Sequence, residues 1–152
     1  MSLFQPHLVY CIETWGCSRP TIINPIIILQ KKVIRVINGS GYFDHTDPIF
    51  KDLKILKVED LFYYFICIYS FKVMKNLKYA ELFTKICDFQ VSHGHSLRSD
   101  ELRLPYVNIL KFKQSIIYQV ASNWNKIPNN LKDINTLSNF KRQLKVILLD
   151  RH

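Results

Sequence analysis

Apolar residues recur at helical spacing in the last third of the chain. Four of them stand at i, i+3, i+4 and i+7 and therefore share one face of a helix: Ile117, Val120, Ala121 and Trp124. Ser115 is expected to cap this helix, because its hydroxyl can accept a hydrogen bond from an amide of the first turn. Pro128 has no amide hydrogen and disfavours a helical conformation at the residue before it, so the pattern predicts a break between residues 125 and 130.

A second amphipathic helix is predicted directly after this break, with Thr136 as its cap. Its apolar seam consists of Leu137, Phe140, Leu144 and Leu148. Three cations, Lys141, Arg142 and Lys145, stand away from that seam at i, i+1 and i+4. The two helices predict a corner with one apolar and one basic side, in which Trp124, Pro128 and Phe140 are the expected structural anchors.

The N-terminal part of the chain repeats this arrangement. One helix is expected to carry Leu8, Cys11, Ile12 and Trp15 on a single face and to end at Gly16, with Trp15 as a further anchor. The next helix is predicted to run to about Ile37, before the Asn38–Gly39 pair. Its expected apolar stripe is Ile26, Leu29, Val33 and Ile37. Lys31, Lys32 and Arg35 cluster on its other side, either as a binding surface or as an ordinary solvated face.

The middle of the chain predicts further helices. Thr46 should cap a short one that ends at Leu53, and a central helix should run from Val58 to about Asn76. The apolar window 61–71 is about half the roughly 20 residues that cross a bilayer, so a buried core helix is expected and no membrane span. A short helix over 79–89, a polar loop over 92–100 and at most one edge hairpin over 102–112 follow. The sequence thus predicts an all-α multi-helix bundle forming a single domain, residues 1–152.

Composition and charge narrow the range of partners. Hydrophobic residues make up 48% of the 152 positions, which excludes a disordered tail, and the net charge is +9. Such a charge favours an anionic partner, although an AT-rich coding sequence would also produce many lysines. The N-terminus has no basic segment before its apolar run, so it does not match a signal peptide, and we expect an intracellular protein with reduced cysteines.

No pattern of reactive side chains predicts catalysis, a cofactor or a metal site. The cysteines and histidines do not match the spacings of zinc ligands. The short Ser-His-Gly-His-Ser run at 92–96 is better explained as a solvated loop. Each closely spaced pair of acids fits a turn, a helix N-terminus or a loop better than a site that holds two metal ions. No catalytic residue is therefore assigned.

Three segments of the chain contain recognisable motifs. Residues 6–16 match a P-x-L-x-Y-x-x-x-x-W-G pattern, and residues 29–37 are similar to an L-Q-K-+-x-I-R-x-I helix. Residues 115–128 match S-x-x-x-x-x-A-S-x-W-N-x-I-P and are followed by F-K-x-x-L-K-x-x-L-L. In motifs and in order, these segments resemble the post-palm, C-terminal region of reverse transcriptases from non-LTR (LINE-type) retrotransposons. The palm with its paired aspartates, which the family pattern also contains, is not found, and Met1 is expected to be a truncation point.

The resemblance implies a thumb-side segment that contacts RNA or an RNA–DNA hybrid and packs against a palm in the parent enzyme. Backbone phosphates are the expected ligands of the two basic trios, because lysine and arginine on a helix fix nucleic acid in place without reading its sequence. Two alternatives stay open. The chain could be a basic helical adaptor that binds a protein partner, or a decayed reading frame without selected activity.

Overall fold

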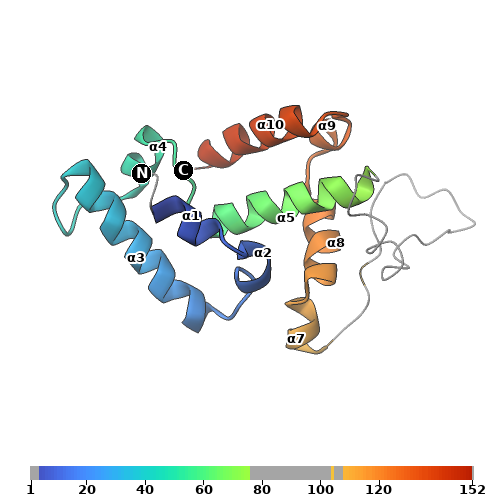
Figure 1. Ribbon diagram of the computed structural model, residues 1–152, viewed down its shortest axis with the longest axis horizontal. Helices are drawn as coiled ribbons and strands as arrows, with labels where there is room; N and C mark the ends of the chain where they lie inside the picture. The colour runs from blue at the N-terminus through green and yellow to red at the C-terminus, as the bar shows by residue number, and fades with distance from the viewer. Residues whose placement is uncertain (1–3, 76–103, 105–107, 152) are drawn as a thin grey trace, which may run out of the picture. The chain divides into compact units, whose positions relative to one another are not determined.

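The computed structural model describes residues 4–75, 104 and 108–151. These residues form nine helices and no strand, which confirms the predicted all-α class (Figure 1). In chain order the helices are α1 (Phe4–Val9), α2 (Ile12–Trp15), α3 (Pro20–Asn38), α4 (Asp47–Asp52), α5 (Val58–Met74), α7 (Leu110–Lys113), α8 (Ile116–Lys126), α9 (Asn129–Lys132) and α10 (Leu137–Leu149).

The chain divides into two compact units. Unit 1 contains Met1–Tyr64 and Arg142–His152, and unit 2 contains Phe65–Lys141. Both boundaries fall inside helices, α5 and α10, so each of these helices contributes residues to both units. The expectation of one helical domain stays a prediction.

The N-terminal helix predicted from the sequence is in fact two short helices, so that prediction is wrong at its centre. Cys11 lies between α1 and α2 with a φ of 50°, in the left-handed region, and this ends α1 at Val9. Trp15 holds the resulting corner, because its indole Nε1 donates a hydrogen bond of 2.8 Å to the Tyr10 carbonyl. Gly16 follows α2, as predicted, and a Cβ at this position would collide with the Phe62 ring.

Helix α3 ends where the sequence predicts, since Gly39 takes the left-handed conformation (φ 66°) at its C-terminus. Its buried face differs from the predicted stripe. Ile23, Gln30 and Ile34 are the buried residues, whereas Leu29 and Ile37 are 57% and 42% exposed. At 100° per residue, the centres of the predicted and the buried faces differ by about 75° around the helix axis. Ile34 packs with Ile49, Phe50 and Ile55 in a hydrophobic cluster of unit 1, and this cluster fixes which face turns inward.

Gln30 is a buried polar residue that connects α3 to the start of α5. Its side-chain Nε2 donates to the Leu56 carbonyl at 2.9 Å, and its Oε1 accepts from the Val58 amide at 3.0 Å. All three residues are at most 3% exposed. The Leu56 carbonyl precedes α5 and the Val58 amide begins it, so neither group has a hydrogen-bond partner within that helix. The Gln30 side-chain amide pairs with both groups in place of water.

We expect Gln30→Ala to destabilise the protein by about 2–4 kcal/mol, because it leaves a buried donor and a buried acceptor without partners. Leu29→Ala is the matched control on the same helix. Its side chain is exposed, so the change should stay within about 0.5 kcal/mol. Urea unfolding followed by circular dichroism measures both. Equal midpoints for the two variants would show that the Gln30 hydrogen bonds contribute nothing to stability.

The central helix is confirmed. Helix α5 begins at Val58 as predicted, and Glu59 is its one exposed residue out of seventeen. This agrees with the expected core position of the window 61–71, and among the residues that the structure describes no helix is both long and apolar enough to cross a bilayer. Helix α4 has the predicted extent and Thr46 is its N-cap residue, as predicted, but the Thr46 side chain makes no capping hydrogen bond.

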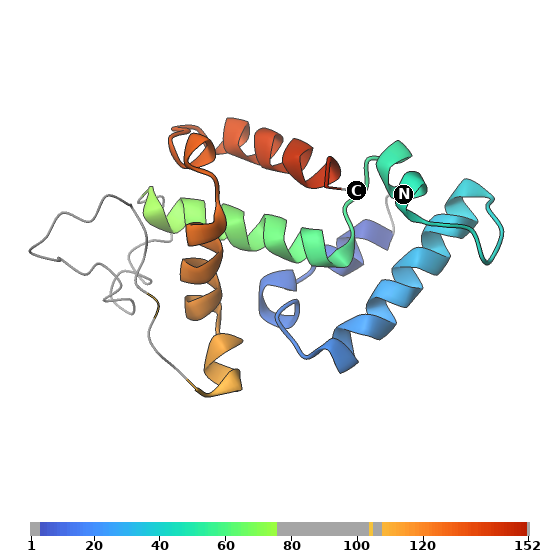
Figure 2. The ribbon, with the colours of Figure 1, turned by 180° about the vertical axis from the view of Figure 1, so that it is seen from behind.

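The predicted corner of α8, α9 and α10 belongs to unit 2 up to Lys141, and Leu144 and Leu148 of its seam belong to unit 1. Ser115 caps α8 by accepting a hydrogen bond from the Tyr118 amide at 3.4 Å. Both views show α8 beside the C-terminal half of α5 (Figures 1 and 2), where the Ser70 hydroxyl donates to the Val120 carbonyl at 3.1 Å. Phe71 and Phe140 stack with ring centroids 4.4 Å apart. The seam of the second helix is confirmed at Phe140, Leu144 and Leu148, all buried.

Two details of this region differ from the prediction. The break around Pro128 contains a short helix, α9, that the pattern missed, with Pro128 as its N-cap. The proline ring restrains φ, which is −58° here, and the amide hydrogen that proline lacks is not needed for a helix hydrogen bond at this position. The expected hairpin over 102–112 is wrong at its C-terminal end, because Leu110–Lys113 is helix α7. The rest of that hairpin, the helix over 79–89 and the loop over 92–100 lie outside the described residues.

Candidate nucleic-acid interface

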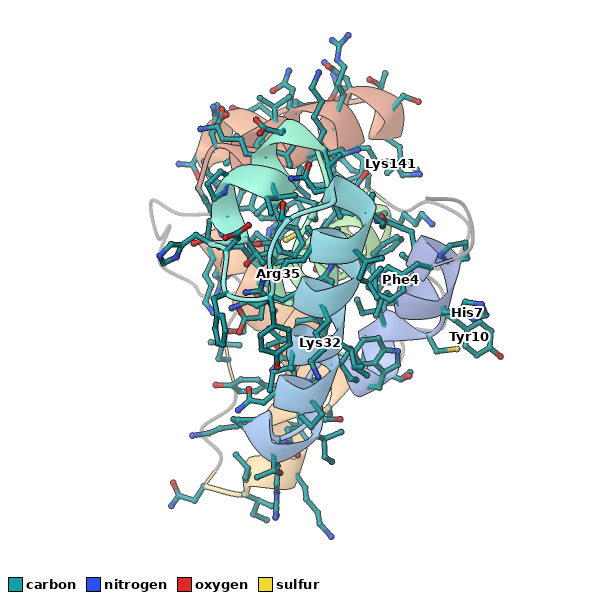
Figure 3. All side chains as sticks on the ribbon, turned by 90° about the vertical axis from the view of Figure 1, so that its left-hand side faces the viewer. Phe4, His7, Tyr10, Lys32, Arg35 and Lys141 are labelled. Carbon is teal, nitrogen blue, oxygen red and sulfur yellow. The ribbon has the colours of Figure 1, made fainter. Side chains whose placement is uncertain are left out.

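The first basic trio lies on α3. Lys32 stands two positions after the buried Gln30, about 200° further around the helix axis, and its side chain is exposed. Lys31 and Arg35 stand at smaller angles from the buried face and are half-buried. Figure 3 shows Lys32 and Arg35 on the same side of α3. The helix therefore presents one exposed cation to solvent and two half-buried cations along the margin of its packed face.

Arg35 also organises the loop that follows α3, residues 39–46. Its Nε donates to the Asp44 carbonyl at 2.9 Å, and its own carbonyl accepts from the Ser40 amide at 3.0 Å. The Asp44 carboxylate closes the loop by accepting from the Gly41 amide at 2.6 Å. These bonds hold the loop against the C-terminal end of α3, and guanidinium nitrogens other than Nε stay available for a further acceptor.

The loop exposes two aromatic rings at its tip. Tyr42 is 66% and Phe43 91% exposed, and their rings meet edge to face with centroids 5.1 Å apart. Both residues follow Gly41 within the turn that the Asp44 carboxylate closes. Exposed adjacent aromatics are unusual on a solvated loop, where small polar residues predominate.

The second trio lies on α10. Arg142 and Lys145 are exposed, and Lys141, directly after the buried Phe140, is half-buried. Arg142 and Lys145 belong to unit 1, as the α3 trio does, and Lys141 belongs to unit 2. The prediction that the cations stand away from the apolar seam holds most fully for Lys32, Arg142 and Lys145, while the other three border a packed face.

The four expected anchors differ in burial. Trp124 and Phe140 are buried, at 4% and 0% exposure, in unit 2. Trp15 is half-buried, and its hydrogen bond to the Tyr10 carbonyl connects α2 to the end of α1. Pro128 is exposed. Lys132 lies over the Trp124 ring at 5.8 Å from its centroid, which adds a cation–π contact to that anchor.

The described residues contain no group of three or more histidine, cysteine or acidic side chains placed to hold a metal ion. Cys11 is exposed, Cys17 is half-buried and Cys67 is buried, and the Cys17 Sγ donates a hydrogen bond to the Thr14 carbonyl at 3.3 Å. Burial raises the pKa of the Cys17 thiol, which disfavours the thiolate that binds metals. The Ser-His-Gly-His-Ser run at 92–96 lies outside the described residues.

Sequence reasoning missed two residues of this surface, Tyr42 and Phe43. They lie in residues 39–45, between the predicted end of one helix near Ile37 and the predicted cap of the next helix, Thr46. The available signal was composition, because two aromatic residues stood side by side in a stretch otherwise rich in glycine and polar residues. Gln30 was missed too, since a glutamine next to two lysines resembles part of a solvated face.

Comparisons with known proteins relate part of the chain to retroelement polymerases. It is 38% identical over 58 residues to the RNA-directed DNA polymerase from mobile element jockey of Drosophila funebris, and 36% identical over 59 residues to that of Drosophila melanogaster. The aligned segments cover 38% and 39% of this chain and 6% of each relative. The similarity supports a segment related to non-LTR retrotransposon reverse transcriptases.

No protein-family model matches the chain, and no solved structure matches it.

Proposed function

We propose that this chain is a C-terminal, thumb-side segment of a non-LTR retrotransposon reverse transcriptase, which holds template–primer nucleic acid without a catalytic centre of its own. Its ligand is RNA or an RNA–DNA hybrid, bound through backbone phosphates by Lys31, Lys32 and Arg35 on α3 and by Lys141, Arg142 and Lys145 on α10. In the parent enzyme the segment packs against the polymerase palm.

Partial similarity to the jockey polymerases supports the retroelement origin of this proposal. The observation that carries the binding role is the exposure of Lys32, Arg142 and Lys145 on two helices whose other faces are buried. A helix fixes the spacing of the Cα atoms, while the long side chains adjust to successive phosphates. Such contacts position a nucleic acid and carry no sequence information.

A salt titration of the purified protein on a labelled RNA–DNA hybrid tests the proposal. Binding should be weak, tolerant of sequence and steeply dependent on salt, with log K falling by about 0.7–0.9 per neutralised phosphate for each tenfold rise in salt. Hybrids of two unrelated sequences should give the same constants. Absence of binding at low salt would overturn the proposed role.

The same proposal predicts that the purified chain does not extend a primer on an RNA template with magnesium or manganese. Two-metal catalysis needs carboxylates that stabilise both the attacking and the leaving oxygen, and the sequence offers no such pair within a palm. A full-length reverse transcriptase serves as the positive control. Primer extension that disappears when an acid of this chain is mutated would contradict the prediction.

A second candidate function is protein binding, favoured by an apolar stripe on α3. Ile22, Leu29 and Val36 recur every seven residues and are all more than half exposed. A stripe of this kind suits a helix of a partner protein. This adaptor function predicts that the hybrid is not bound, or that binding is unchanged when both basic trios are neutralised.

A further inference from the structure

The tip of the loop over residues 39–46 combines features that differ from those of a plain phosphate-binding helix. Two adjacent aromatic rings, Tyr42 and Phe43, are exposed, and the loop carrying them is tied to Arg35 of the α3 trio by the 2.9 Å bond to the Asp44 carbonyl. An exposed aromatic ring contributes little free energy of stabilisation to the fold. A ring on a loop tied to a cationic helix suits a ligand that is flat and apolar on its face and anionic along its edge.

An unpaired nucleotide has this chemistry. Its base offers a π-face to an aromatic ring, and its phosphate offers charge to lysine or arginine. We propose that Tyr42 and Phe43 form a stacking site for an unpaired base in a single-stranded stretch of RNA or DNA, while Lys32 and Arg35 contact the adjacent phosphates. The inference rests on the proposed function and assigns it a substrate class, the single-stranded part of a template–primer.

The geometry of the loop supports a prepared site. The two rings stand at 87° to each other, so the edge of one meets the face of the other, and further ring surface stays open to solvent. The closing bond from the Gly41 amide to the Asp44 carboxylate and the Ser40–Arg35 backbone bond restrict the backbone of the loop. Less conformational entropy is therefore lost when a base stacks.

Charge favours a nucleotide over an apolar protein partner at this position. Arg35 contacts the loop directly, and Lys31 and Lys32 stand one turn before it on α3. Asp44 is the one acid in residues 38–46, and its carboxylate already accepts the Gly41 amide. An apolar protein surface would have to desolvate these cations, whereas a phosphate would pair with them.

The test compares two labelled ligands, a blunt RNA–DNA hybrid and the same hybrid with a single-stranded overhang containing 2-aminopurine, whose fluorescence reports stacking. The variant is Tyr42→Ala with Phe43→Ala. Both side chains are exposed, so the fold should persist, and circular dichroism checks it. Tyr10→Ala is the matched control, because Tyr10 is also an exposed aromatic of unit 1, 77% accessible.

Wild type and Tyr10→Ala should bind the overhang hybrid about 5- to 100-fold more tightly than the blunt one and change the 2-aminopurine fluorescence. The double variant should lose this preference and the fluorescence change, while its affinity and salt slope on the blunt hybrid stay the same.

Three results would overturn the inference. Equal wild-type affinity for the two hybrids would remove the stacking site and leave phosphate binding intact. Equal weakening of the double variant on both hybrids would assign the rings a general role in the fold or in binding. Failure to bind either hybrid would refute both the stacking site and the proposed function.

Discussion

Replacing the six residues of the two basic trios with glutamine should flatten the salt dependence of hybrid binding by up to about 4–5 units of slope, since each lost phosphate contact removes about 0.7–0.9. The residues are Lys31, Lys32, Arg35, Lys141, Arg142 and Lys145. Glutamine keeps much of the side-chain length and the helix propensity, so helicity should be unchanged while the charge disappears.

A comparison of two triple variants separates specific contacts from the effect of net charge. Lys32, Arg142 and Lys145 are the exposed members of the trios, and their replacement by glutamine should account for about half of the flattening or more. Lys111, Lys113 and Lys126 are also exposed and lie outside both trios. Replacing these three lysines with glutamine also removes three positive charges, but the slope of log K against log salt should then stay close to that of the wild type.

The measurement is the slope of log K against log salt, taken for all variants on one hybrid. Circular dichroism spectra confirm that the variants keep their helices. A slope unchanged by the six-residue replacement would reject the thumb-like role and favour the adaptor function. Equal flattening by the two triple variants would show that net charge alone, and not the helix surfaces, attracts the nucleic acid.

Helix positions were predictable because local signals determined them. The end of α3 at Gly39 and the start of α8 after Ser115 each depend on a backbone or side-chain property of a few adjacent residues. The seam of α10 was equally clear, because Phe140, Leu144 and Leu148 recur every four residues. The break at Cys11 was not, since nothing in that residue type demands a left-handed conformation.

The buried face of α3 could not be predicted, because isoleucine and valine occur on most sides of the helix. Which side packs depends on residues distant in sequence, namely the cluster around Phe50 and the two backbone groups at Leu56 and Val58 that Gln30 satisfies. A buried glutamine is stable only when both ends of its amide find partners, and those partners lie more than 25 positions away in the chain.

The candidate site also has a part that the sequence predicts and a part that it does not. Cations could be assigned to helix surfaces from spacing alone, but their exposure required the packed faces to be known. That Lys31, Arg35 and Lys141 border those faces follows from the actual rotation of each helix, not from the i, i+1, i+4 pattern. The Tyr42–Phe43 pair depends on a loop conformation set by Arg35 and Asp44, and no periodicity describes such a loop.

Trp124→Ala should destabilise the protein by about 3–5 kcal/mol, an effect large enough to unfold a marginal domain. The indole is 4% exposed and lies on α8 among the buried residues Val120, Ala121 and Asn123, so truncation leaves a cavity that helix packing cannot easily close. It also removes the ring beneath the Lys132 ammonium group.

Trp124→Phe and Lys126→Ala keep this prediction testable if the alanine variant does not fold. The Trp124 Nε1 is buried and has no hydrogen-bond partner among the described residues, so phenylalanine loses ring volume but no hydrogen bond, and its cost should be roughly half that of alanine or less. Lys126 is exposed on the same helix, and its replacement should change stability by no more than about 0.5 kcal/mol. Urea unfolding monitored by circular dichroism ranks the three variants. A cooperative transition of Trp124→Ala at the wild-type midpoint would show that the corner of α8, α9 and α10 does not depend on this side chain.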